Sequence, residues 1–187
     1  MRLSENQMAN MKRILQYRKQ PANSIISKDI KGDIHYIDSF GIEINNTNSY
    51  SIDYLVALVF SSIPGWTRVL LNLRDFLVKP FGLETGLVPE QKAIDASLRY
   101  NVGDRATFFP VIDRSESEIV MSEDDKHLYF RISLLVEKNS HHNLDVIYLT
   151  TLVQFHNIWG KLYFAPVKPF HKMIMRSLLK KLSQTLN

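Results

Sequence analysis

The second half of the chain contains four strand-like runs in close succession, and this feature limits the possible folds more than any other. The runs are rich in β-branched and aromatic residues, and the polar connections between them have the length of hairpin loops. Consecutive strands joined by hairpins form an antiparallel meander. The runs are "ATFFPVI" (106–112), "SEIVMS" (117–122), "HLYFRISLLVEK" (127–138) and "LDVIYLTTLVQFHN" (144–157).

One strand and two helices are predicted ahead of the meander. Residues 33–44, "DIHYIDSFGIEI", alternate imperfectly and are rich in Ile, Tyr and Phe, which is typical of a strand. The polar loop that follows offers Ser49 or Ser51 as the N-cap of a helix over residues 52–62. Pro64 then suits the first turn of a second helix over residues 64–79, which Pro80 ends.

A long helix is predicted at the C-terminus, over residues 166–186. Its apolar stripe comprises Val167, Phe170, Ile174, Leu178 and Leu182, with basic residues on the other side. A basic amphipathic helix suits a membrane surface. The antiparallel sheet needs an apolar cover, however, so we favour a core helix whose basic back is solvated.

The order of these elements predicts an α+β fold. Strands and helices do not alternate, so a doubly wound parallel sheet is excluded, and we expect a curved antiparallel sheet wrapped around the C-terminal helix. The 187 residues fit one domain better than two. We therefore expect a single domain over residues 21–187, preceded by an arm or short helix over residues 1–20.

Composition narrows the classes of function. The absence of cysteine excludes disulfides, thiolate chemistry and cysteine-bound metals, and it suits a cytoplasmic protein. The net charge of +4 is mild and no nucleic-acid motif is present, so we expect no nucleic-acid partner. No run of apolar residues is long enough to span a membrane. We expect neither a cofactor nor a metal, because HExxH, P-loop, GxGxxG and GxSxG patterns are all missing.

Five short segments carry a resemblance to a known family. The chain resembles a bacterial family called domain of unknown function 2867, and its order of elements resembles the helix-grip architecture of START domains and polyketide-cyclase-like proteins. The resemblance implies a helix-grip fold with an apolar cavity and implies no reaction. The matching segments are "YIDSF" (36–40), "IPGWTRVLLNLRD" (63–75), "FGLETG" (81–86), "DKHLYFRIS" (125–133) and "KPFHKMI" (168–174).

The run that begins at residue 127 separates two faces. Leu128 to Val136, at every second position, form the more apolar face, whereas His127, Tyr129 and Arg131 line the other. If the second face lines the cavity, it can orient an anionic or hydroxylated ligand; if it faces outward, it is solvated, which we favour. The acidic stretch just before it, Ser122 to Lys126, is interpreted as a hairpin turn rather than a catalytic cluster.

Other candidate ligand-binding residues are scattered along the chain. Trp66 and Arg74 lie on the predicted second helix, where Arg74 is expected to be buried beside a carboxylate such as Asp38, Glu118 or Asp125. A dyad of His171 with an aspartate, or of His127 with a glutamate, remains open. Further pocket-lining candidates on the last strand and helix are Tyr148, Thr150, His156, Met173 and Met175.

Three classes of function remain possible for such a domain. We expect first a non-catalytic module that binds a small hydrophobic or lipid-like ligand between the sheet and the C-terminal helix. The second is an enzyme of cyclase, dehydratase or hydrolase type that uses His, Tyr or Asp in that pocket. The third is an accessory module that binds a protein partner. No catalytic residue is assigned, and the oligomeric state is left open.

Overall fold

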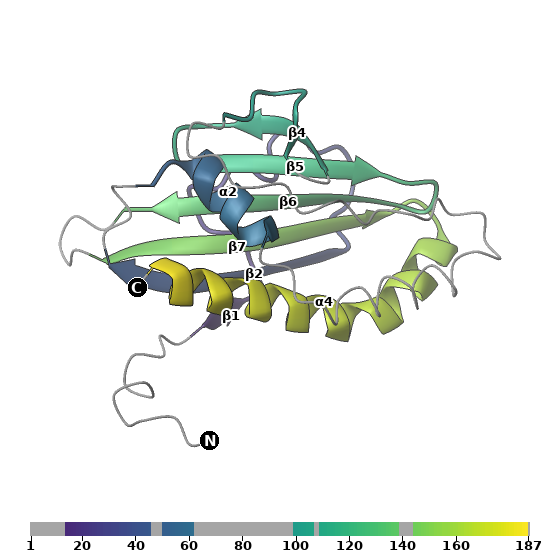
Figure 1. The fold of residues 1–187 in the computed structure, drawn as a ribbon. Helices are drawn as coiled ribbons and strands as arrows, with labels where there is room; N and C mark the ends of the chain where they lie inside the picture. Colours follow the sequence, from purple (N-terminus) through teal and green to yellow (C-terminus); the bar gives the residue numbers. More distant parts are fainter. Residues whose placement is uncertain (1–13, 46–49, 62–98, 107–108, 139–143, 187) are drawn as a thin grey trace, which may run out of the picture.

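A seven-stranded antiparallel sheet forms the centre of the molecule (Figure 1). The computed structural model describes residues 14–45, 50–61, 99–106, 109–138 and 144–186. The strand order is β1-β2-β7-β6-β5-β4-β3. The strands are β1 (Leu15–Tyr17), β2 (Tyr36–Asn45), β3 (Arg105–Ala106), β4 (Phe109–Arg114), β5 (Glu118–Asp124), β6 (Leu128–Glu137) and β7 (Leu144–Phe155).

The predicted meander is confirmed. Strands β4, β5, β6 and β7 pair in sequence order, and β2 then pairs with β7 on the far side. Within the predicted arm, Leu15–Tyr17 form β1, which pairs with β2 at the edge of the sheet. The stretch Ser122–Lys126 is only partly a turn, because β5 continues to Asp124 and the chain reverses at residues 125–127.

The first helix, α2 (Ile52–Ser61), lies where the sequence predicts it. Ser51 caps its start, since the hydroxyl Oγ accepts the Tyr54 N–H at 3.1 Å and the carbonyl accepts the Leu55 N–H. The predicted second helix, with Trp66 and Arg74, lies outside the described residues.

The C-terminal helix α4 (Ile158–Leu186) begins eight residues earlier than predicted. Asn157 provides the cap, because its Oδ1 accepts the N–H groups of Trp159 and Gly160. The predicted start at residue 166 was wrong, because Pro166 and Pro169 both lie inside the helix. Both prolines are exposed, so the carbonyls they leave without an N–H donor are on the solvent side.

The buried stripe of α4 differs from the predicted one by one position in the first half. Phe164 and His171 face the sheet, whereas Phe170 is exposed, so its assignment to the core was wrong. The first half of α4 carries apolar side chains on two faces, and the face with Phe164, not the one with Phe170, packs on the sheet. The C-terminal part is as predicted, with Met175, Leu178, Leu179 and Leu182 in the main core.

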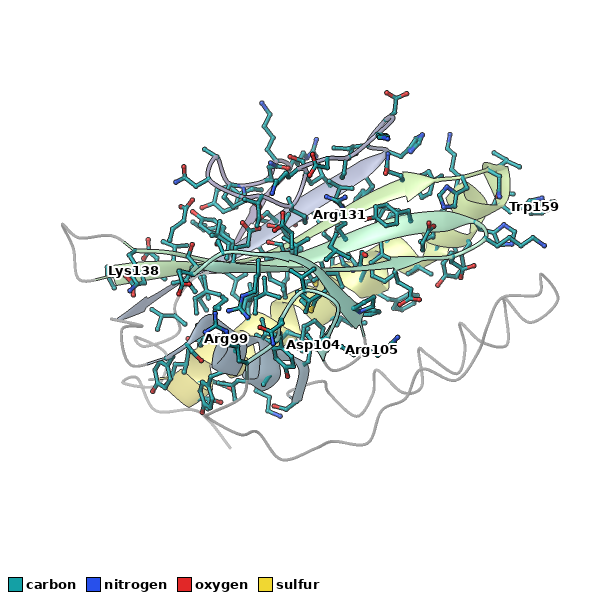
Figure 2. All side chains as sticks on the ribbon, turned by 90° about the horizontal axis from the view of Figure 1, so that it is seen from above. Arg99, Asp104, Arg105, Arg131, Lys138 and Trp159 are labelled. Atoms are coloured by element: carbon teal, nitrogen blue, oxygen red, sulfur yellow. The ribbon has the colours of Figure 1, made fainter. Side chains whose placement is uncertain are left out.

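The sheet is covered on both faces (Figure 2). Helices α2 and α4 cover what we call the helix face, where Phe40, Leu134 and Leu149 meet the side chains of both helices. Residues 20–35, the N-terminal segment, cover the opposite face, called the segment face. There Ile26 packs with Val120 and Leu152. A candidate site on the sheet is therefore enclosed by one cover or the other.

Candidate functional site

A cluster of polar side chains lies on the helix face of the sheet, between β2, β7 and α4. Asp38 alternates along β2 with Phe40 and Ile42, so its side chain points toward α4, and it is only 2% exposed. The residues around it are Tyr36, Thr151 and His171, and we call these four residues the Asp38 cluster.

Both carboxylate oxygens of Asp38 accept a hydrogen bond. The Tyr36 hydroxyl donates to Oδ2, and His171 Nε2 lies 3.2 Å from Oδ1. Because a carboxylate only accepts, Nε2 carries the proton in this contact, which leaves Nδ1 of a neutral His171 as an acceptor. The dyad of His171 with an aspartate, left open by the sequence, is thus present in the structure.

Tyr36 keeps its proton under all ordinary conditions. Burial raises the pKa of the Tyr36 hydroxyl far above its usual value, and the hydrogen bond and negative charge of Asp38 raise it further. The Tyr36 ring packs on Phe164, and Lys168 Nζ lies 4.7 Å from the ring centre. Tyr36 is therefore a fixed donor to Asp38.

Thr151 is the member of the cluster whose hydrogen bonding is incomplete. It is the register partner of Asp38 across β2 and β7 and shares the helix face with it. In the part of the chain that the structure describes, its buried hydroxyl Oγ1 has no hydrogen-bond partner. A buried hydroxyl without a partner costs roughly 1–3 kcal/mol, so such a group calls for a physical reason.

Aromatic side chains border the Asp38 cluster. Phe155 and Phe164 lie with ring centres 5.6 Å apart and belong to an apolar group that includes Tyr36 and Phe130. Glu123 lies on β5, opposite Phe130 of β6. Its oxygen Oε2 is buried and lacks a hydrogen-bond partner among the described residues. The helix face therefore combines apolar walls with a few polar groups, as ligand sites commonly do.

The polar side chains of β6 that were predicted as ligand-binding residues lie on the segment face of the sheet. Tyr129 and Arg131 point away from α4, as the alternation predicts, but they are partly buried, and Arg131 contacts the N-terminal segment. Arg131 donates to the carbonyls of Ile26 and Lys28, at 2.8 and 2.6 Å, and to the Tyr129 hydroxyl at 2.7 Å (Figure 2). Arg131 thus holds the N-terminal segment in place, and the Tyr129 hydroxyl accepts a hydrogen bond from Arg131.

Glu118 completes this attachment of the N-terminal segment. Its buried carboxylate accepts hydrogen bonds from the Ser24 hydroxyl and the Ile25 N–H, at 2.6 and 2.8 Å, and from the Ser133 hydroxyl. A buried carboxylate is tolerated when its lone pairs are satisfied in this way. Glu118 is thus a structural anchor, not a catalytic group.

His127 and His156 lie at the junction of the β5–β6 turn with the start of α4. His127 Nδ1 contacts Asn157 Oδ1 at 3.2 Å, whereas His156 Nε2 contacts Asp124 Oδ1 at 2.7 Å. The side chains of His156 and Asp124 are both exposed, and an exposed ion pair contributes little to stability. The acidic stretch considered as a catalytic cluster therefore supplies one surface pair and a turn.

Tyr148 and Thr150 lie on the segment face, away from α4. Thr150 Oγ1 lies 2.8 Å from Ser39 Oγ, and the Tyr148 ring packs against Tyr17. Burial raises the pKa of Tyr148, with a further contribution from the Glu137 charge. Of the two methionines considered for the pocket, Met175 is in the core and Met173 is exposed. The structure brings His171, but not these residues, into the Asp38 cluster.

A second polar site lies between α2 and β4. Arg114 contacts both carboxylate oxygens of Asp53 at 3.1 Å and donates to the Tyr100 carbonyl, while the Tyr100 N–H donates to Asp53 at 2.7 Å. A depression of about 230 Å³ adjoins this pair. Its walls are Tyr50, Ser51, Ile52, Asp53, Arg99, Arg114, Glu116, Ser117, Val136 and Lys138. Since Asp53 and Arg114 satisfy one another, we regard this pair as structural.

Three members of the Asp38 cluster, Tyr36, Asp38 and Thr151, were missed as site residues. Asp38 shares the parity of Phe40 and Ile42, so an acid on the apolar face of β2 was a signal that the sequence offered. Thr151 offered no such signal, because β7 is apolar on both faces and its parity cannot be read.

Comparisons with known proteins identify a family that matches the chain, and they indicate no activity. The profile of the family described as "Protein of unknown function (DUF2867)" matches residues 30–178. Searches of the curated proteins and of the solved structures found no match. Within the described ranges, no helix has both the length and the apolar character needed to cross a membrane. The same residues contain no group of His, Asp and Glu side chains arranged to hold a metal ion.

Proposed function

The chain belongs to this family of unknown function, and we propose that it binds a small, largely apolar molecule with one polar end on the helix face of the sheet, at the Asp38 cluster. The long helix across an antiparallel sheet supports a helix-grip architecture as part of this proposal. Such folds place ligands between sheet and helix, where the Asp38 cluster is found.

The observation that carries the proposal is the Thr151 hydroxyl. Among the described residues it has no hydrogen-bond partner, although it is buried beside two satisfied polar groups. A ligand that supplies the partner removes the cost of this unpaired group when it binds. The hydroxyl of the neighbouring Thr150, on the other face, lies 2.8 Å from Ser39 Oγ, so the two threonines differ in their hydrogen bonding.

The surroundings of Thr151 define the class of ligand. Asp38 already accepts hydrogen bonds from Tyr36 and His171. The polar end of a ligand is therefore best hydrogen-bonded by the Thr151 hydroxyl or by His171 Nδ1. The aromatic side chains nearby suit an aliphatic or aromatic body. Lys168, close to the Tyr36 ring, favours an acidic end over a basic one. A fatty acid or an aromatic acid fits this description.

A second candidate function is an acid–base enzyme. The buried contact between His171 and Asp38 favours it, because an aspartate that accepts from one imidazole nitrogen fixes the tautomer and leaves the other nitrogen as a general base. Tyr36 provides a further donor to the same carboxylate. Cyclases and dehydratases use such groups on apolar substrates, so this function and ligand binding share one site.

A displacement assay with two threonine variants tests the binding proposal. We expect the folded protein to bind 8-anilinonaphthalene-1-sulfonate with increased fluorescence, and dodecanoate to displace it. Thr151→Val preserves the shape of the side chain and removes the hydroxyl, so dodecanoate binding should weaken by about 2- to 10-fold, the worth of one hydrogen bond.

Thr150→Val is the matched control, since it makes the same change one residue away on the segment face. It should leave the affinity for dodecanoate unchanged. Equal effects of the two variants, or no binding of the probe by the folded protein, would contradict the proposal. The enzyme alternative predicts that the wild type converts an ester or a hydroxy acid and that His171→Gln does not. If the wild type converts neither, and His171→Gln still binds dodecanoate, the enzyme alternative is removed.

A further inference from the structure

The first half of α4 has a second apolar face, opposite the one that packs on the sheet. Ile158, Leu162 and Met173 are 59%, 56% and 51% exposed, although each is a large apolar side chain. Their positions, with Pro166 and Phe170, recur at helical spacing and so form one stripe along the outside of the helix. We call these side chains the outer stripe; they are Ile158, Trp159, Leu162, Pro166, Phe170 and Met173.

The charge of α4 is of one sign. The helix contains no Asp or Glu over its 29 residues. Lys161 and Lys168 are exposed on the flank of α4 nearer the sheet, where Lys168 Nζ lies over the Tyr36 ring, and further exposed cations follow in the last turns. The basic residues of α4 are Lys161, Lys168, Lys172, Arg176, Lys180 and Lys181.

We propose that the outer stripe of α4 docks on an anionic lipid surface. An exposed apolar stripe on a helix whose charged side chains are all cations has the composition of helices that lie in the plane of a membrane interface. Anionic headgroups complement the lysines while the apolar side chains enter the headgroup–acyl boundary. A second copy of the chain is a poorer occupant, because two such helices face to face bring like charges together.

The position of Trp159 supports this orientation. Trp159 lies at the free end of the molecule, at the start of α4, and is half exposed (Figure 2). Tryptophan prefers the interface between water and hydrocarbon. Pro166 and Pro169 leave the carbonyls of Leu162 and Ala165 without helical donors on this side, so the helix should rest at headgroup depth, where water is present.

Vesicle binding of the full chain tests the proposal. We expect the protein to co-sediment with vesicles of equimolar phosphatidylcholine and phosphatidylglycerol, and far less with phosphatidylcholine alone. Binding should blue-shift the tryptophan fluorescence, and Trp159→Phe should lose this shift while Trp66 remains. Raised salt concentration should weaken the binding, since the attraction to the headgroups is screened.

Two pairs of substitutions separate the apolar and the charged contributions. Leu162→Ser with Met173→Ser should lower the affinity for the mixed vesicles about tenfold or more, since both side chains then stay in water. Lys161→Gln with Lys180→Gln should lower it by about tenfold as well. All four side chains are exposed, so the unfolding temperature should not change.

The matched controls lie elsewhere on the surface. Val102→Ser changes a residue that is 59% exposed outside α4, and Lys31→Gln changes an exposed cation on the N-terminal segment; neither should alter vesicle binding. Equal binding by the α4 variants and the controls overturns the proposal, as does failure of the wild type to bind the mixed vesicles. A stable dimer that Leu162→Ser with Met173→Ser converts to a monomer, without vesicle binding, assigns the stripe to a second copy instead.

Discussion

Gly160 determines how closely the start of α4 approaches the β5–β6 turn. A Cβ atom at this position would lie 2.1 Å from the carbonyl oxygen of His127, a backbone atom that cannot move aside cheaply. The same oxygen accepts the N–H of His156 at 2.9 Å. The absence of a side chain at Gly160 therefore allows the helix to begin against the turn.

Replacing Gly160 with alanine should destabilise the protein by about 1–3 kcal/mol, because the added methyl group forces the helix and the turn apart. Without the close approach, the substitution would instead stabilise an internal helical position by up to about 1 kcal/mol. Urea unfolding followed by circular dichroism gives the sign. A stabilised variant would show that α4 does not dock as described.

The pKa of Tyr36 gives a prediction for alkaline pH. Because the pKa of Tyr36 is raised in the folded state, the unfolded chain loses the phenol proton first, at about pH 10. The contribution of this group to stability is complete below that pH and decreases as the pH rises further. Wild type should thus lose up to about 1.4 kcal/mol per pH unit more than Tyr36→Phe above pH 10.

Urea unfolding of both proteins between neutral pH and strongly alkaline pH measures this difference. Tyr100 and Tyr148, whose pKa values are also raised by burial, are present in both proteins and cancel in the comparison. Parallel curves for wild type and Tyr36→Phe would mean that the pKa of Tyr36 is not raised in the folded protein.

At the scale of elements, one ion pair joins α2 to the β4 edge of the sheet. Asp53 lies in the first turn of α2, and its carboxylate holds Arg114 of β4 and the backbone of Tyr100. Asp53 and Arg114 have little exposed side-chain surface, at 7% and 15%. The sequence predicted a buried, paired arginine at Arg74, which lies outside the described residues; Arg114 is an arginine of this kind.

Arg114→Met should destabilise the protein by about 3–5 kcal/mol, since it leaves the Asp53 carboxylate buried without its cation. Adding Asp53→Asn should recover part of the loss, because the uncompensated charge is then removed. Arg99→Met, at an exposed position near the same depression, serves as the control and should change stability by less than about 0.5 kcal/mol. A similar small effect at Arg114 would place that pair in solvent.

The long helix shows what sequence patterns determine and what they leave open. The stripe from Ile174 to Leu182 predicted the C-terminal half of α4 correctly, since no other face of that segment is apolar. The first half carries two apolar faces and two prolines, so periodicity could not select the buried face or the start. Packing of Phe164 on the sheet made that choice.

At the scale of the whole molecule, the sheet is a layer between two unlike covers. The helix face is closed by α2 and α4 through apolar contacts, and the segment face is closed by residues 20–35 through Arg131 and Glu118. The sequence predicted the meander and the helical cover from alternation and order. The second cover was not predicted, because an irregular segment held by side-chain hydrogen bonds has no periodic signature.

Deleting residues 166–187 should leave an unfolded or aggregating chain. The deletion removes Met175, Leu178, Leu179 and Leu182 from the main core. Each such side chain contributes about 1.5–3 kcal/mol, against a total stability of about 5–15 kcal/mol. Circular dichroism and size-exclusion chromatography of the truncated chain check this expectation. An unchanged melting temperature would show that the sheet is stable without its helical cover.

The most direct test of the proposed function compares the unfolding free energies of Thr151→Val and Thr150→Val in the ligand-free protein. If the Thr151 hydroxyl is buried without a partner until a ligand arrives, its removal should stabilise the free protein by about 1–3 kcal/mol. Thr150→Val, which leaves Ser39 unpaired, should destabilise it by a similar amount. Destabilisation by Thr151→Val would show that the hydroxyl already has a partner within the protein, and would contradict a ligand contact there.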